Sequence, residues 1–391
     1  MKRLPIYTLA AALCAGTLMA IPPQPPEGYR WVINEQFSDN FDGDKLDSSK
    51  WMDHYNGGWK GRAPAWFNPD AVSVEGGLLR IRSGTLDKPK GRKGEFTMYG
   101  GAVSSKTRGA HFGYYECRAK ASRIGMSTTF WLSNQKEPFT EKGDCKTDTY
   151  SQELDIQEAV GGNAAFPKFE SSMNSNTHFR YVKCGAKKEE FISEGLSVEL
   201  DSPVYADYHV YGAWWKNENE AAFYANDKHT ETVAFRTDVS DRPFDRPMQI
   251  NMVVETYDWQ PPPTAEELEN AEINTALYDW VRSYELVPIG EEAKMTPEFK
   301  VFEETVEFST EAEIDRLSIA YSYKANEDCF LDLTLEAVDG DVLRHRKISA
   351  YQGFGHDTYL EMIKPELVES ITIKLISKSS GRVLATANTD S

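Results

Sequence analysis

The chain has 391 residues, 40% of them hydrophobic, and a formal net charge of −18 at pH 7. This hydrophobic share is enough for a sizeable core, and the length favours two domains. The strong negative charge argues against nucleic acid or an anionic membrane as the main partner, because both would repel it. Aromatic residues make up 12% of the chain, which favours an all-β protein and is also compatible with a cleft that stacks sugar rings.

Residues 1–20 have the features of a secretory signal peptide. A basic start is followed by an apolar stretch from about Ile6 to Met19, and Ala20 is a plausible cleavage point. The stretch is too short to cross a membrane. We therefore expect a secreted, periplasmic or cell-surface protein without a membrane span. Cys14 raises the possibility of a lipid anchor, although the residue before it fits a lipid-attachment motif poorly.

Short strand-like segments make up most of the remaining chain. After a Pro-rich segment at 21–30, alternating apolar and polar residues with Gly, Asn, Asp and Pro between them predict strands over 31–290. A second series over 299–391 predicts a small C-terminal β-sandwich. The best helix candidate is 264–275, which opens with a capping-box pattern.

The cysteine pattern is compatible with export. Cys145 and Cys184 lie in neighbouring loop-like stretches and could pair in an oxidising compartment, whereas Cys117 is expected to be a buried thiol. No C-x-x-C motif occurs, so neither a thiolate zinc site nor a redox motif is expected.

The segment SQELDIQEAV carries three acidic residues close together. Side chains alternate along a strand, so Glu153 and Asp155 share one face. Glu158 joins them only if a β-bulge adds one residue, and Leu154 and Ile156 then point into the core. Such crowding raises the pKa of at least one acid, as a general acid at neutral pH requires. A solvated acidic face or a calcium-binding face is the alternative.

The same segment resembles the bulged E-x-D-x-x-E signature of glycoside hydrolase family 16, in its agarase and porphyranase branch. Flanking segments agree in order over roughly 31–286, among them WKGRAPAWF, GAVSSKTRGAHFGYYECRAKAS, MSTTFWL, SNTHF and DWVRSYEL. The resemblance implies a jelly-roll β-sandwich of two curved antiparallel sheets, with a cleft across the concave face.

The resemblance also implies roles for individual residues. Glu153 would be the nucleophile of a retaining mechanism, Glu158 the acid/base, and Asp155 an assisting carboxylate. The implied substrate-binding residues are Trp59, Arg62, Trp66, Trp131, His178, Glu255 and Trp259. Each of these also has a purely structural explanation, such as a core tryptophan or a surface ion pair. Asp279 resembles a ligand of a structural calcium, whereas the family chemistry itself needs no cofactor.

We therefore expect a secreted retaining endo-hydrolase of β-1,4-galactosidic bonds in agar-type red-algal galactans, with a β-agarase as the main interpretation. A β-porphyranase that acts on sulfated agar galactan, or a κ-carrageenase-like enzyme, is the alternative. A non-catalytic galactan-binding lectin is the alternative of another class. The expected partner is agarose or porphyran, and the expected state is a monomer. The basic loop at 88–93 either meets substrate sulfate or is only solvated surface.

Overall fold

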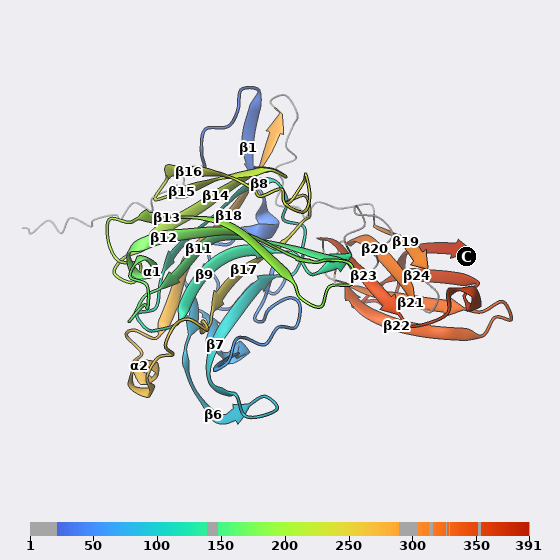
Figure 1. Ribbon diagram of the computed structural model, residues 1–391, viewed down its shortest axis with the longest axis horizontal. Coiled ribbons are helices and arrows are strands. Elements are labelled where there is room, and N and C mark those ends of the chain that lie inside the picture. Colours follow the sequence, from blue (N-terminus) through green and yellow to red (C-terminus); the bar gives the residue numbers. More distant parts are fainter. Residues whose placement is uncertain are drawn as a thin grey trace, which may run out of the picture.

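The computed structural model describes residues 22–138, 148–288, 304–312, 316–325, 327, 329–350 and 353–390 (Figure 1). The predicted signal peptide and the segment that joins the two predicted domains lie outside these ranges. Within them, no helix is long and apolar enough to cross a membrane.

Two large β-sheets form the N-terminal part, as predicted. The eight-stranded sheet runs in the order β16 (Lys228–Ala234), β15 (Glu220–Ala225), β14 (His209–Asn217), β8 (Gly113–Lys120), β18 (Thr275–Pro288), β5 (Leu79–Arg82) and β4 (Val72–Val74), with β1 (Tyr29–Ile33) beside β18. The ten-stranded sheet runs in the order β13 (Glu190–Glu199), β12 (Ser172–Val182), β11 (Thr149–Val160), β9 (Ser127–Ser133), β17 (Gln249–Val254), β7 (Phe96–Ser105) and β2 (Trp51–Met52). At its margins lie β10 (Glu137–Pro138), β3 (Ala65–Phe67) and β6 (Gly84–Lys90).

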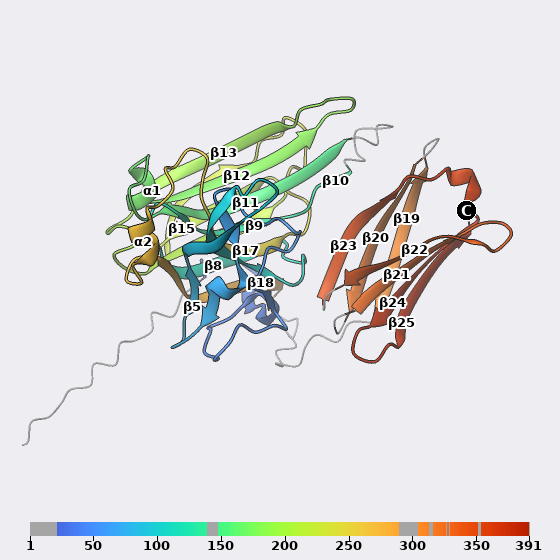
Figure 2. The ribbon, with the colours of Figure 1, turned by 90° about the horizontal axis from the view of Figure 1, so that it is seen from below.

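One hydrophobic core joins the two sheets. Phe130 and Leu154 of the ten-stranded sheet and Trp215 and Tyr278 of the eight-stranded sheet are fully buried in it. Because side chains alternate along each strand, the residues between these core positions point to the other face of the sheet. Figure 2 shows β9, β11, β12 and β17 together in the ten-stranded sheet, whose outer face carries the site described below.

The helices are few and short in the described part of the chain: η1 (Glu35–Phe37), η2 (Pro69–Ala71), α1 (Lys168–Ser171), α2 (Ala265–Glu269) and η4 (Pro365–Leu367). The predicted capping box is present, because Thr264 and Glu267 exchange their hydrogen bonds at the start of α2. The helix ends at Glu269, earlier than predicted. Leu268 is the one residue that α2 buries, so no apolar face supports a longer helix.

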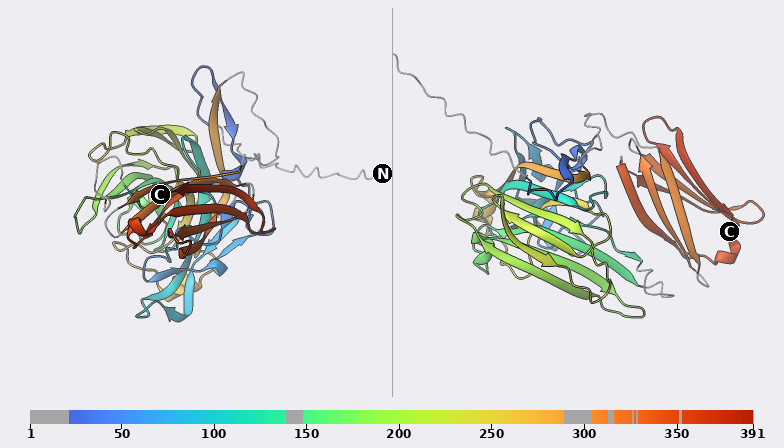
Figure 3. Two further views of the ribbon diagram at one scale, coloured as in Figure 1. Left: turned by 90° about the vertical axis from the view of Figure 1, so that its right-hand side faces the viewer. Right: turned by 90° about the horizontal axis from the view of Figure 1, so that it is seen from above.

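The C-terminal strands have their own core. One sheet contains β19 (Thr305–Ala312), β20 (Leu317–Ala325) and β23 (Gly353–Glu361), and the other contains β22 (Val342–Ala350), β21 (Cys329–Glu336), β24 (Ser370–Ser377) and β25 (Val383–Asp390). Strand β21 buries every second residue, from Cys329 to Leu335, in a cluster separate from the N-terminal core. Figure 3 shows these strands, in orange to red, as a sandwich of their own.

The cysteines differ in state. Cys117 is a buried free thiol, as expected. Cys329 is also buried, and its thiol donates a hydrogen bond to the carbonyl of Glu327 at 3.2 Å. Cys184 is disulfide-bonded. Cys145, its expected partner, lies outside the described residues.

Candidate active site

A β-bulge in β11 gathers the three acidic side chains. The register between β11 and β9 shifts at Ile156, so that Asp155 lies opposite Trp131 and Glu158 lies opposite Thr129. Trp131 and Thr129 are two positions apart on β9 and therefore share a face. The bulge thus places Asp155 and Glu158 on the same face of the sheet, as predicted from their spacing.

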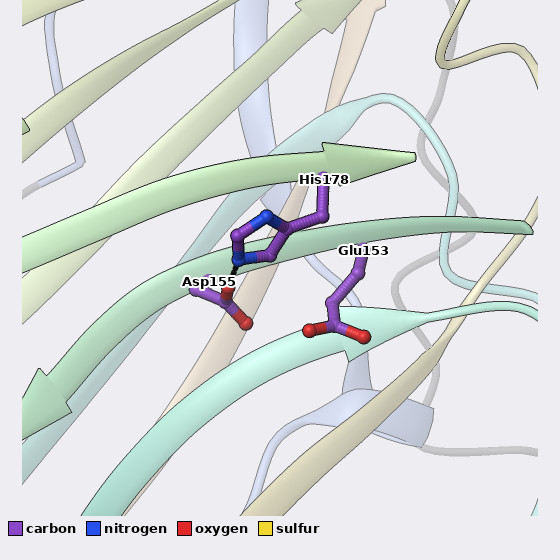
Figure 4. A group of neighbouring side chains, drawn as sticks. All are labelled: Glu153, Asp155 and His178. Carbon is purple, nitrogen blue, oxygen red and sulfur yellow. Dashed lines mark ion pairs between the residues drawn. The ribbon is translucent and has the colours of Figure 1, made fainter. Parts of the chain in front are cut away.

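The neighbouring strand β12 supplies a cation for each of the first two acids. Arg180 Nη1 lies 2.8 Å from Glu153 Oε2, and His178 Nε2 lies 2.9 Å from Asp155 Oδ2. His178 is directly opposite Glu153 in the register, so both ion pairs run diagonally between the strands. Figure 4 shows the imidazole of His178 directed at Asp155, with the carboxylate of Glu153 beside them.

Burial and mutual repulsion separate the protonation behaviour of these groups. Burial, and then the charge of Asp155, raise the pKa of Glu158 to about 7. Burial, and then the charge of Glu153, raise the pKa of Asp155. Burial opposes a charged His178, but its hydrogen bond to Asp155 and the surrounding carboxylates raise its pKa overall. Glu158 can therefore hold a proton near neutral pH, as a general acid must.

A second group of residues surrounds Glu158. The hydroxyl of Tyr257 donates a hydrogen bond to Glu158 Oε1 at 2.8 Å, and the ring of Trp259 stacks on that of Tyr257 at 4.9 Å. Arg62 lies over the same tyrosine ring, 5.3 Å from its centre, and its Nε is 3.5 Å from Glu255 Oε2. Burial raises the pKa of Glu255 to about 8, although the charge of Arg62 lowers it. Tyr257 thus links the three predicted residues to Glu158. Arg62 and Trp259 pack against its ring, and Glu255 pairs with Arg62.

A pocket of about 540 Å³ opens beside Glu153. Its walls include the aromatic residues Tyr55 and Trp59 and the cationic residues Arg108, Lys136 and Arg180. Tyr55 stacks on Trp131 at 5.8 Å, and Trp59 meets Tyr55 edge-on at 5.4 Å. Trp59 and Trp131 therefore lie near the acids, as predicted, and an aromatic wall of this kind suits the apolar face of a sugar ring.

Trp66 is not brought to the acids. On β3 it points away from its buried neighbours Ala65 and Phe67, and it packs edge-on against Phe96 at 5.1 Å. Lys90 of the basic loop lies over the Trp66 ring at 5.2 Å. Trp66 and the basic loop therefore form a separate group beside the β6–β7 hairpin.

Asp279 lies on β18 in the eight-stranded sheet, away from the acids. Its carboxylate forms an ion pair with Nη1 of Arg118, whose guanidinium also covers the ring of Tyr208 at 4.4 Å. A calcium ion needs oxygen ligands, and a guanidinium in contact with the carboxylate would repel it. The residues around Asp279 therefore do not fit the calcium ion that the resemblance implies.

Among the described residues, one trio of His, Asp and Glu side chains has ligand atoms within 4.8 Å of one another: Glu153, Asp155 and His178. Ion pairs account for this closeness without a metal. Within the trio, His178 pairs with Asp155. The third member, Glu153, pairs with Arg180. We therefore interpret the trio as an acid–base group and assign no metal to it.

Three residues of the site were not predicted from the sequence: Arg180, Tyr257 and Tyr55. Arg180 follows His178 by two positions on β12, and alternation alone places it on the same face. Tyr257 lies midway between Glu255 and Trp259, which were both predicted. Nothing in the sequence around Tyr55 marks it as a neighbour of Trp131.

Comparison with known proteins agrees with this geometry. Residues 31–286 match the GH16 domain of β-porphyranases A–D. The chain is 39% identical to β-porphyranase D of Zobellia galactanivorans over 362 residues, which cover 88% of this chain and 84% of that one. The match therefore extends beyond the GH16 domain into the C-terminal strands.

The solved β-porphyranase of the human gut bacterium Bacteroides plebeius has 41% identity and a TM-score of 0.64, covering 68% of this chain and 95% of that one. A β-agarase of Phocaeicola plebeius is more distant, at 27% identity over 68% of this chain and 89% of that one. The chain therefore belongs to glycoside hydrolase family 16, within the group of β-porphyranase A–D domains.

Proposed function

We propose that this glycoside hydrolase is a β-porphyranase, an endo-hydrolase of β-1,4-galactosidic bonds in sulfated agar galactan. The observation that carries the proposal is similarity: the chain is 39% identical to a β-porphyranase but 27% identical to a β-agarase. The agarase interpretation favoured by the sequence analysis is thus the less well supported, and its porphyranase alternative replaces it.

The charge of the pocket supports an anionic substrate. The chain as a whole carries a net charge of −18, yet the pocket beside Glu153 has three cationic side chains in its walls, Arg108, Lys136 and Arg180. Carboxylates offset part of this charge, because Lys136 pairs with Glu189 and Arg180 pairs with Glu153. We expect a sulfate ester to share these cations more strongly than a neutral hydroxyl group does. The basic residue Arg62, beside Glu255, adds a fourth cation near the acids.

The two outer acids suit a retaining mechanism. In the first step, the Glu153 carboxylate attacks the anomeric carbon while the glycosidic C–O bond breaks and Glu158 gives its proton to the leaving oxygen. In the second step, Glu158 takes a proton from water, and the resulting hydroxide displaces Glu153 from the sugar. A pKa of about 7 suits Glu158 to both steps. All proton transfers use groups of the protein itself, so the proposal requires no metal or cofactor in catalysis.

The N-terminal sequence indicates where the enzyme acts. A polymer such as porphyran is met outside the cell, and the N-terminal sequence predicts a signal peptide. A more distant relative is the extracellular agarase of Streptomyces coelicolor, at 24% identity. We therefore propose that the enzyme works outside the cytoplasm.

Kinetics on three polymers test the substrate. Release of reducing ends is measured with porphyran, chemically desulfated porphyran and agarose, at equal galactose content. We expect a kcat/KM at least about tenfold higher for porphyran than for the other two, which corresponds to roughly 1.4 kcal/mol of discrimination. Equal or faster cleavage of agarose would contradict the porphyranase assignment and restore the agarase interpretation.

A further inference from the structure

We propose that Arg180 is a positioning residue for the nucleophile: its ion pair keeps the Glu153 carboxylate aimed at the anomeric carbon. The inference rests on the proposed function, because it takes Glu153 as the nucleophile. Arg180 is not among the residues that the family resemblance implies. Its Nη1 donates a hydrogen bond to Glu153 Oε2 at 2.8 Å.

Arg180 is itself held in place from two other sides. Its guanidinium lies over the ring of Phe191 at 5.0 Å, and its Nε is 3.7 Å from Glu189 Oε1. Glu189 also pairs with Lys136 across the pocket wall. The Arg180 side chain is 30% exposed, so solvent only partly screens its charge. A guanidinium fixed in this way is preorganised, and it gives Glu153 little freedom to turn.

The same aromatic ring links both cations of β12. Phe191 on β13 packs against the imidazole of His178 at 4.5 Å as well as against Arg180. Phe191 thus packs against both side chains that pair with the acids of β11.

The charges around Glu153 show why a cation is needed. The acids that face it are Asp155 and Glu158 on β11 and Glu255 after β17. The other titratable neighbours are His178, Arg180 and Tyr55, and in the pocket wall Arg108 and Lys136. Of these, Arg180 bonds directly to the Glu153 carboxylate. Without it, the repulsion of the three neighbouring acids would turn the Glu153 carboxylate out of line. The nucleophile would then no longer face the anomeric carbon.

Arg180 also lines the pocket, so contact with a substrate sulfate is the competing role. The two roles separate in kinetics. A sulfate contact made in the ground state raises KM when it is lost, whereas loss of a positioned nucleophile lowers kcat.

The test compares Arg180→Gln, Arg180→Lys and Arg180→Ala with the wild-type enzyme, on whichever galactan the wild type cleaves. For Arg180→Gln we expect kcat to fall about 100-fold, as for loss of one charged donor in a preorganised site, with KM nearly unchanged. The acidic limb of the kcat profile should move to higher pH, because the charge of Arg180 lowers the pKa of Asp155 in the wild type. Added guanidinium should restore part of the activity of Arg180→Ala, and Arg180→Lys should retain more activity than Arg180→Gln.

Arg236→Gln is the matched control. It breaks another arginine–carboxylate pair, with Asp238 at the surface, and it should leave both kcat and the pH profile unchanged. A raised KM with an unchanged kcat in Arg180→Gln would overturn the positioning role in favour of substrate contact. A uniform loss without a pH shift or guanidinium rescue would leave only a structural role. A wild type inactive on porphyran but active on agarose would refute the substrate proposal and leave the Arg180 test intact.

Discussion

The hydroxyl group of Tyr257 donates a hydrogen bond to Glu158 Oε1 at 2.8 Å. Tyr257 follows the end of β17, while Glu158 lies on β11, with β9 between the two strands. A donated hydrogen bond stabilises the charged form of a carboxylate and lowers its pKa. The bond therefore limits the effect of burial, which with the charge of Asp155 raises the pKa of Glu158 to about 7.

Tyr257→Phe removes this hydrogen bond and keeps the ring. The pKa of Glu158 should rise, so the basic limb of the kcat/KM profile should move to higher pH, because the acid keeps its proton longer. A single hydrogen bond contributes about 1 kcal/mol, so kcat/KM at the optimum should fall by no more than about tenfold. A basic limb that stays in place or moves to lower pH would contradict this role of Tyr257.

Asp155→Asn should shift the basic limb of the kcat/KM profile in the opposite direction from Tyr257→Phe. The charge of Asp155 is, after burial, the largest cause of the raised pKa of Glu158, so its removal should lower that pKa. The basic limb should then move to lower pH, and activity at neutral pH should fall about 10-fold or more as the general acid loses its proton. The pH dependence of reducing-end release measures the shift, and Tyr257→Phe is its control of opposite sign.

Glu116 makes the stability of the protein depend on pH. It is buried on β8, and burial raises its pKa to about 8. Because the folded state holds the proton above the ordinary pKa of 4.5, its contribution is complete below that value and is lost as the pH rises through about 8. Buried Glu158 and Glu255 act in the same direction.

Glu116→Gln should remove the contribution of Glu116 alone. We expect the variant to lose less stability than the wild type between pH 5 and pH 8, with a difference of about 2–4 kcal/mol in the free energy of unfolding at the upper end. Urea unfolding at a series of pH values measures it. Parallel curves for the two proteins would show that Glu116 does not titrate in this range.

The Arg118–Asp279 ion pair leads to a prediction about calcium. A guanidinium in contact with the Asp279 carboxylate occupies the place of a cation, so EDTA should leave the melting temperature unchanged. Arg118→Gln should lower stability by about 1 kcal/mol at most, because both side chains are partly exposed. A melting temperature that falls with EDTA and recovers with added calcium would support the calcium site instead.

Local alternation explains what could be predicted from the sequence. The bulge in β11 follows from the spacing of Asp155 and Glu158, because no regular strand places both on one face. The same argument applies to His178 and Arg180 on β12, yet Arg180 was overlooked because its importance depends on a partner in another strand. The alternating pattern of the C-terminal strands likewise predicted a second β-rich unit.

Contacts between distant segments explain what could not be predicted. Alternation gives the face of a residue within its strand, but it does not say which strands are neighbours. Tyr257 therefore could not be linked to Glu158, or Arg118 to Asp279. Trp66 was expected in the cleft, but the orientation of β3 beside β7 turns it toward Phe96.

The central claim is that Glu153 is the nucleophile of an enzyme that cuts porphyran. Its most direct test incubates the wild type and Glu153→Gln with porphyran and with agarose, and identifies the released oligosaccharides by mass spectrometry. Folding of the variant is confirmed by its melting temperature. We expect sulfated oligosaccharides from porphyran with the wild type, little or no release from agarose, and no release from either polymer with Glu153→Gln. Products from agarose alone, or from porphyran with Glu153→Gln, would contradict the claim.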